Sequence, residues 1–190
     1  MILDCIKHKT VNIKTHKDIK SMLNGVPHDT NGKSQTLAAN NLFQINKTDL
    51  SLDEFTAMLF YHNVAKLFFL CKQTRPDLQT AMAFLCTQVN SLDKDDYNKL
   101  SCIIKCLCGT PNFPLRLKAN NSQSEQWYMN ASYGVHVNMK NHTVATVTMG
   151  KGAVHLTSIR QKLITKISTE GVLVRVNDAM PQTLWTWYFL

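Results

Sequence analysis

The spacing of hydrophobic and polar residues changes along the chain and predicts three parts. Residues 1–50 are mostly polar and contain turn-forming pairs such as Asn24-Gly25, which predicts an irregular polar arm with room for a short helix near Lys17–Leu23. Within residues 51–118, apolar residues recur every three or four positions, as on one face of an α-helix. Residues 119–190 begin with alternating, strand-like segments.

The middle part predicts three helices. Ser51-Leu52-Asp53-Glu54 matches a capping box, in which Ser51 accepts a free helix amide and Glu54 reaches back. This helix should end before Pro76, because proline disfavours helical geometry in the preceding residue. A second helix begins near Thr74–Asp77 and a third covers Lys94–Cys108. The apolar stripe of the first helix is Phe55, Met58, Leu59, Val64, Leu67 and Phe68.

Four segments that alternate or are rich in β-branched and aromatic residues predict strands: Pro114–Lys118, Gln126–Tyr133, Thr143–Met149 and Ala153–Ser158. Gly150-Lys151-Gly152 separates the last two and favours a hairpin turn. A final helix is predicted over Thr169–Leu190, with a kink or break at Pro181.

Length and charge limit the classes of protein. The 190 residues suit one or two small domains, and the net charge of +8 suggests an acidic partner such as nucleic acid. A solvated basic surface is the alternative. No apolar run approaches the roughly 18 residues of a membrane span, and residues 1–10 show no signal-peptide pattern. We therefore expect an intracellular protein, cytoplasmic or nuclear, without membrane contact.

The six cysteines are expected to be mainly small buried groups in a reducing compartment. A metal site is the alternative, because Cys102 and Cys106 are four residues apart and Cys108 is near. Against it, there is no Cys-x-x-Cys pair and no histidine close in sequence. Cys108 as a nucleophile is disfavoured too, because nothing nearby in sequence should lower its pKa.

Five short motifs occur in one order along the chain: Arg75-Pro76-Asp77, Cys106–Thr110, Trp127–Ser132, Gly150–Val154, and Arg160–Leu163 followed by Ser168-Thr169-Glu170. This succession resembles the region after the polymerase site in copia-type retrotransposon polyproteins. The resemblance covers the chain from about residue 50 to its end and extends more weakly into the first fifty residues.

The resemblance implies an α+β fold. Residues 51–118 would be the helical segment that connects the reverse transcriptase to the next domain. Residues 119–190 would form the first half of an RNase H-like domain, with three antiparallel strands followed by a packed helix. The later strands and helices of that domain would lie beyond Leu190, which would leave the strand over Trp127–Tyr133 as an open edge.

The resemblance also indicates which residues would carry the chemistry. RNase H enzymes hold two Mg²⁺ ions with clustered carboxylates. The first carboxylate position falls on Asn130, and the second, in a Ser-Thr-Glu-Ala-Glu pattern, falls on Val172, with Glu170 adjacent. The ligand positions are thus neutral or absent, and we expect neither bound metal nor hydrolysis here.

Two further groups of residues could suggest a catalytic site, but a structural role is the better interpretation of each. Asp95-Asp96 is the one Asp-Asp pair, but it lacks the aromatic context of a polymerase site and suits the first turn of a helix. Ser132 with His136 or His142 suggests a nucleophile and base, but no nucleophile-elbow motif accompanies them.

Nucleic-acid contact is the activity most consistent with the remaining residues. Arg160, Gln161, Lys162 and Lys166 precede the last helix and could reach phosphates. The leading hypothesis is a degenerate, non-catalytic copia-type fragment. The alternatives are a weak module that binds RNA–DNA hybrid or the element's intact polymerase, and a cysteine-based metal-binding protein.

Overall fold

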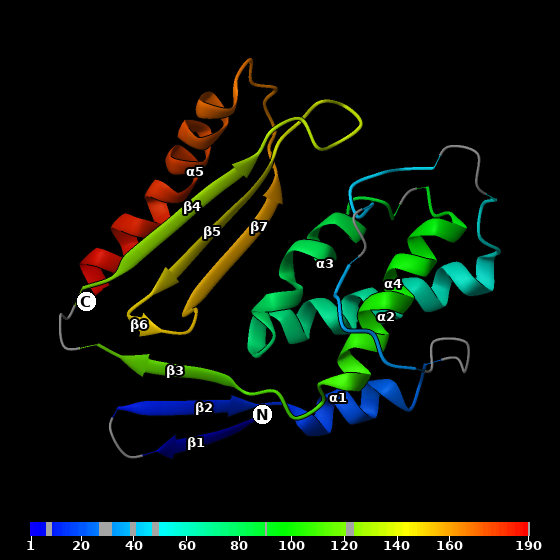
Figure 1. The fold of residues 1–190 in the computed structure, drawn as a ribbon, viewed down its shortest axis with the longest axis horizontal. Helices are drawn as coiled ribbons and strands as arrows, with labels where there is room; N and C mark the ends of the chain where they lie inside the picture. The colour runs from blue at the N-terminus through cyan, green and yellow to red at the C-terminus, as the bar shows by residue number, and fades with distance from the viewer. Residues whose placement is uncertain are drawn as a thin grey trace.

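The computed structural model describes residues 1–6, 9–26, 32–38, 41–46, 50–89, 91–120 and 124–189. It is a mixed α+β fold with two small antiparallel sheets (Figure 1). The strands are β1 Ile2–Ile6, β2 Thr10–Lys14, β3 Leu115–Ala119, β4 Gln126–Ser132, β5 His142–Thr148, β6 Gly150–Lys151 and β7 His155–Arg160. The helices are α1 His16–Leu23, α2 Glu54–Gln73, α3 Gln79–Leu85, α4 Lys94–Gly109 and α5 Ser168–Phe189, with a 3-10 turn at Pro76–Leu78.

The prediction of an irregular arm over residues 1–50 is wrong for its first half. Strands β1 and β2 form an antiparallel hairpin, and β2 also pairs with β3 through Val11 and Leu117. The short helix near Lys17–Leu23 is confirmed as α1, which contributes Ile19 and Met22 to the core. The two strands of the hairpin are adjacent in sequence, but β3, which extends them into a sheet, lies about a hundred residues later, so the sequence did not show that this segment belongs to a sheet.

The three predicted helices are present, but the first two begin differently. The segment Thr74–Asp77, predicted to start the second helix, leads into the 3-10 turn over Pro76–Leu78, and α3 begins only at Gln79. Asp53, not Ser51, caps α2, because its carboxylate accepts the Thr56 N–H at 3.0 Å. The buried face of α2 is also rotated from the predicted stripe, since Phe55 and Met58 are exposed. Its buried apolar residues are Phe60, Val64, Leu67, Leu70 and Cys71.

The end of α2 and the end of α4 are joined by a buried guanidinium. Arg75 is 2% exposed and binds the Asp77 carboxylate, with Nη2 to Oδ2 at 2.8 Å and Nε to Oδ1 at 3.0 Å. Its Nη1 also donates to the Thr110 carbonyl at 3.2 Å. Because a buried charge is tolerated when it is paired and hydrogen-bonded, Arg75 can hold this corner of the helical core.

The second sheet has the strand order β4-β5-β7, and α5 packs on β4 and β5 (Figure 1). The predicted three antiparallel strands followed by a helix are therefore confirmed. Pro181 does not break α5, which continues to Phe189. Leu190, the predicted last residue of this helix, lies outside the described residues. Strand β4 pairs only with β5 within the described part, so its outer edge is open.

The two sheets are linked where a simple hairpin turn was predicted. Residues Gly150 and Lys151 form β6, which pairs with β3 of the first sheet while β5 and β7 pair with each other. Gly150 has a φ of 149°, and a Cβ there would lie 2.2 Å from the Lys118 carbonyl oxygen. Only glycine allows this approach of the two backbones.

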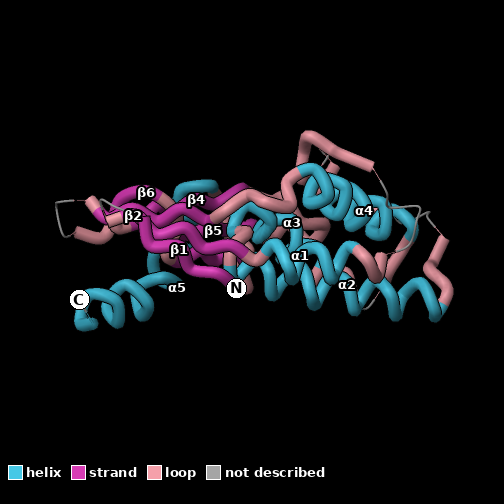
Figure 2. Tube along the Cα trace, turned by 90° about the horizontal axis from the view of Figure 1, so that it is seen from below, coloured by secondary structure: helices cyan, strands magenta, loops and turns pink. Residues whose placement is uncertain are grey.

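The helical core lies beside the second sheet, where α3 packs next to β7 (Figure 1). Figure 2 shows α1, α2, α3 and α4 gathered to one side of the strands. The largest buried side chains of the helical core are Phe60, Phe84, Leu67, Leu78, Met82, Leu85, Leu100, Ile103, Ile104 and Leu107. No helix in the described ranges is both long and apolar enough to cross a membrane.

Candidate nucleic-acid interface

Two loops meet where β4, β5 and β7 approach the start of α5. One connects β4 to β5 over residues 133–141, and the other connects β7 to α5 over residues 161–167. We call their exposed surface, together with Arg160 at the end of β7, the basic loop patch. It consists of Arg160, Lys162, Lys166, Tyr133, Leu163, Ile164 and Ile167, all of which are exposed.

A buried amide network holds the two loops together. Asn141 is fully buried, and its Nδ2 donates to Gln161 Oε1 at 3.0 Å and to Thr165 Oγ1 at 2.8 Å. Its Oδ1 accepts the Gly134 N–H at 2.8 Å. Gln161 Nε2 in turn donates to the Gly171 carbonyl of α5 at 2.6 Å. Since each buried amide group has a partner, the network can define one conformation of both loops.

Gln161 was predicted to contact phosphates, and the structure contradicts this. The side chain is 1% exposed, and both ends of its amide are used within the protein. The reason is strand alternation: successive side chains of a strand face opposite sides of the sheet. Gln161 continues β7 and faces α5, while its neighbours Arg160 and Lys162 are exposed.

Two further hydrogen bonds fasten the patch to its surroundings. The Tyr133 hydroxyl donates to the Lys166 carbonyl at 2.7 Å and so joins the two loops directly. The Glu170 carboxylate accepts the Lys166 N–H at 2.7 Å. Glu170 therefore stabilises the entry into α5 by occupying a free amide.

The positions that the resemblance assigns to carboxylates are not brought together. Asn130 pairs with Val144, which pairs with Ser158, so these three share one face of the sheet. The neighbouring Thr157 faces the other way, where its hydroxyl contacts Arg175 of α5. Val172 and Glu170 belong to α5. Asn130 thus lies on the sheet face opposite the helix that carries the second position.

The cysteine alternative gains no support from the geometry. Within the described ranges, no three His, Cys, Asp or Glu side chains are grouped as metal ligands. Cys102 lies near Ser34 Oγ and the Thr36 carbonyl, each at 3.6 Å. Burial raises the pKa of the Cys108 thiol, which confirms that its surroundings do not activate it.

The serine that meets a histidine is Ser158, not Ser132. His142 Nε2 lies 2.7 Å from Ser158 Oγ, and His142 Nδ1 lies 3.1 Å from His136 Nε2. Ser158 Oγ in turn donates a hydrogen bond to Thr80 Oγ1 of α3, at 3.3 Å. These groups are almost completely buried between the sheet and the helical core, except for the half-buried Thr80. This series of hydrogen bonds therefore joins the second sheet to the helical core, and its buried groups are not accessible to a substrate.

The Asp95-Asp96 pair is confirmed as part of a helix start. Both lie in the first turn of α4, where Asp95 pairs with Lys99 at 2.8 Å. Asp96 is buried, with one carboxylate oxygen unpaired, and burial is the main reason that its pKa rises to about 6.

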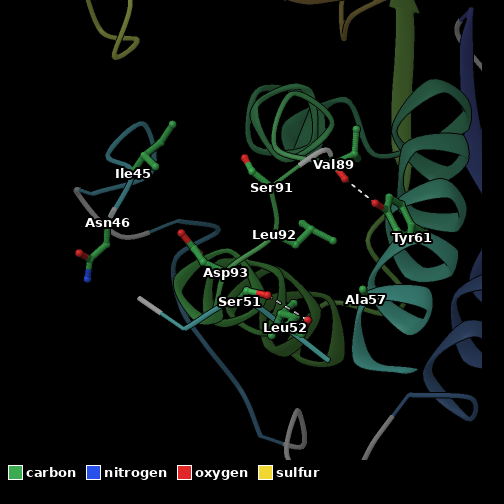
Figure 3. A pocket seen from close by; sticks show the side chains of 10 residues that line it. All are labelled: Ile45, Asn46, Ser51, Leu52, Ala57, Tyr61, Val89, Ser91, Leu92 and Asp93. Carbon is green, nitrogen blue, oxygen red and sulfur yellow. Dashed lines mark hydrogen bonds between the residues drawn. The ribbon is translucent and has the colours of Figure 1, made fainter. Parts of the chain in front are cut away.

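A separate groove of about 470 Å³ lies between the start of α2 and the segment before α4. Figure 3 shows the Tyr61 hydroxyl pointing across it to the Val89 carbonyl, to which it donates a hydrogen bond. Asp93, the one acidic residue among the lining residues, caps α4 by accepting the Asp96 N–H at 2.8 Å. Among the described residues that line the groove, the one carboxylate therefore serves to cap a helix.

The sequence interpretation did not identify Asn141, Thr165 and Tyr133 as parts of this site. One signal was available: Gly171 stands where the Ser-Thr-Glu-Ala-Glu pattern used for the resemblance has alanine. A Cβ at Gly171 would lie 2.3 Å from Asn141 Nδ2, so glycine makes room for the buried amide.

Comparisons with protein-family models, curated proteins and solved structures found no match to this chain.

Proposed function

We propose that this chain is a non-catalytic derivative of the reverse transcriptase–RNase H segment of copia-type retrotransposon polyproteins, and that it keeps weak nucleic-acid binding. The strand order β4-β5-β7 with α5 packed on β4 and β5 supports an RNase H-like arrangement of residues 119–190. The motif succession supports the copia-type origin.

The observation that carries the binding proposal is the basic loop patch. Arg160, Lys162 and Lys166 are exposed together at one end of the sheet, on loops that the Asn141 network holds in place. Cationic side chains on a defined surface attract phosphates without reading sequence. The absence of catalysis follows from Asn130 and Val172, which replace carboxylates and lie on different sides of the sheet.

The test is a salt titration of binding to an RNA–DNA hybrid, combined with a cleavage assay in Mg²⁺. We expect weak binding, and the Lys162→Ala/Lys166→Ala variant should reduce the slope of log K against log salt by about 2. Lys17→Ala/Lys20→Ala is the matched control, because these exposed lysines lie on α1, far from the patch (Figure 1). It should change the slope much less.

Cleavage should be undetectable for the chain and also for the Asn130→Asp/Val172→Glu variant, because two carboxylates on opposite sides of the sheet cannot share metal ions. Cleavage by that variant would contradict our account of the lost site. Equal salt slopes for the patch and control variants would contradict binding at the patch.

A second candidate function is strand addition to the intact polymerase of the same element. The open edge of β4 favours it, because an edge strand offers unpaired backbone groups to another chain. One backbone donor of β4, the Ala131 N–H, forms a hydrogen bond with Asn130 Oδ1 at 2.8 Å. Adding a charge with Tyr128→Lys should weaken co-sedimentation with a copia-type reverse transcriptase, whereas Phe69→Lys on α2 should not.

A further inference from the structure

We infer that the basic loop patch takes unpaired, single-stranded nucleic acid in preference to an RNA–DNA hybrid or a duplex. This inference rests on the proposed nucleic-acid binding and specifies its substrate class. It comes from the side chains that lie between the cations.

The exposed side chains of residues 160–167 are three cations and three aliphatic residues. Gln161 and Thr165 face inward and are buried in the amide network. This leaves Arg160, Lys162 and Lys166 exposed among Leu163, Ile164 and Ile167, whose exposed fractions are 62%, 63% and 59%. The aliphatic side chains are therefore accessible to a ligand that binds the neighbouring cations.

An aromatic ring completes the surface from the other loop. Tyr133 is 44% exposed, and its hydroxyl is anchored to the Lys166 carbonyl at 2.7 Å. Anchoring at the hydroxyl limits the motion of the ring, so little freedom remains to be lost when a base stacks on it. A partly exposed, fixed ring next to a lysine has the composition of single-strand binding surfaces.

The two forms of nucleic acid offer different atoms to such a surface. In a duplex or hybrid the bases are stacked on each other, so a shallow surface meets mainly phosphates and sugars. The four exposed apolar side chains of the patch would then gain no base contact. In a single strand the base faces are accessible and can lie on apolar and aromatic side chains while the phosphates follow the cations.

The charges around the patch agree with an anionic ligand. Residues 160–170 carry three cations, Arg160, Lys162 and Lys166, against one carboxylate, Glu170, so this segment has an excess of positive charge. His136 lies close enough to Arg160 for that cation to lower its pKa further, after burial. The anchored tyrosine favours nucleic acid over an anionic lipid surface, because a base can stack on the ring.

The experiment measures binding of the full chain to a labelled 12-nucleotide single strand, to the same strand in an RNA–DNA hybrid, and to vesicles of anionic phospholipid. We expect the single strand to bind at least about 5-fold more tightly than the hybrid at equal salt. Leu163→Ser/Ile164→Ser should lower single-strand affinity about 5-fold and leave hybrid affinity unchanged. Lys162→Ala/Lys166→Ala should lower both.

Leu173→Ser is the matched control, because Leu173 is an equally exposed leucine that belongs to α5 and not to either loop. It should leave every affinity unchanged. Equal or tighter hybrid binding would overturn the single-strand inference while the proposed function stands. Binding to neither nucleic acid, or to the vesicles alone, would overturn both.

Discussion

Lowering the pH from 7 to 4 is expected to reduce the free energy of unfolding by at least about 3 kcal/mol through the two buried histidines alone. His136 and His142 are 5% and 2% exposed and lie against the rings of Phe43 and Phe84. Burial lowers the pKa of each to about 4, from an ordinary value of 6.5. A loss of this size is large for a small domain.

The sign follows from the direction of these pKa shifts. Well above pH 6.5 both histidines are neutral in the folded and unfolded chain, so they make no pH-dependent contribution. Between pH 6.5 and about 4 the unfolded chain binds protons that the folded chain does not, so the stability falls as the pH falls. Asp96 acts in the opposite direction, because its raised pKa of about 6 lets the folded chain take up a proton first.

Urea unfolding at several pH values would measure this loss. A His136→Gln variant should flatten the decline of stability between pH 6.5 and 4, whereas His62→Gln, which replaces an exposed histidine, should not. Asp96→Asn should make the decline steeper. A His136→Gln profile identical to that of the unaltered chain would show that the pair is already open to water and protons.

Replacing the buried amide with Asn141→Ala is expected to cost about 3 to 5 kcal/mol of stability, because it removes three hydrogen bonds within a buried network. The buried Gln161 Oε1 and Thr165 Oγ1 would each lose a donor, and the Gly134 N–H would lose its acceptor. The basic loop patch should loosen with them. Thermal or urea unfolding measures the loss, and a change below about 1 kcal/mol would contradict the role of the network.

A double-mutant cycle with Gly171→Ala separates the network from general packing. Alone, Gly171→Ala should destabilise the fold, because the new Cβ would lie 2.3 Å from Asn141 Nδ2. In the Asn141→Ala background that atom is gone, so the same substitution should be much less harmful. Equal effects in both backgrounds would mean that the two residues do not contact each other as the structure shows.

The helices and the second sheet could be predicted because their patterns are local. The stripe from Leu100 to Leu107 and the alternation around Val144 each lie within one element, and the structure confirms α4, β5 and their neighbours. The start of α2 was assigned to Ser51 instead of Asp53, because two polar residues so close in sequence can both cap a helix. The sheet of β1, β2 and β3 was missed, because β3 is distant in sequence from the hairpin that it extends.

The candidate site was predicted only in part. The sequence identified Arg160, Lys162 and Lys166, because a cluster of basic residues can be found without knowledge of its contacts in the folded protein. It assigned Gln161 to the same role, because the sequence does not show that this amide meets Asn141 and the Gly171 carbonyl. Tyr133 was not included, because its bond to Lys166 spans two loops.

The sequence alone therefore determined the chemical groups of this protein: neutral residues at Asn130 and Val172, a basic segment before the last helix, and the periodicities that form its helices and strands. Side-chain identity and local spacing are sufficient for these. Only the tertiary structure decided which groups meet. Strand alternation placed Asn130 on the sheet face opposite α5 and turned Gln161 inward, because pairing between distant segments sets the direction of each side chain.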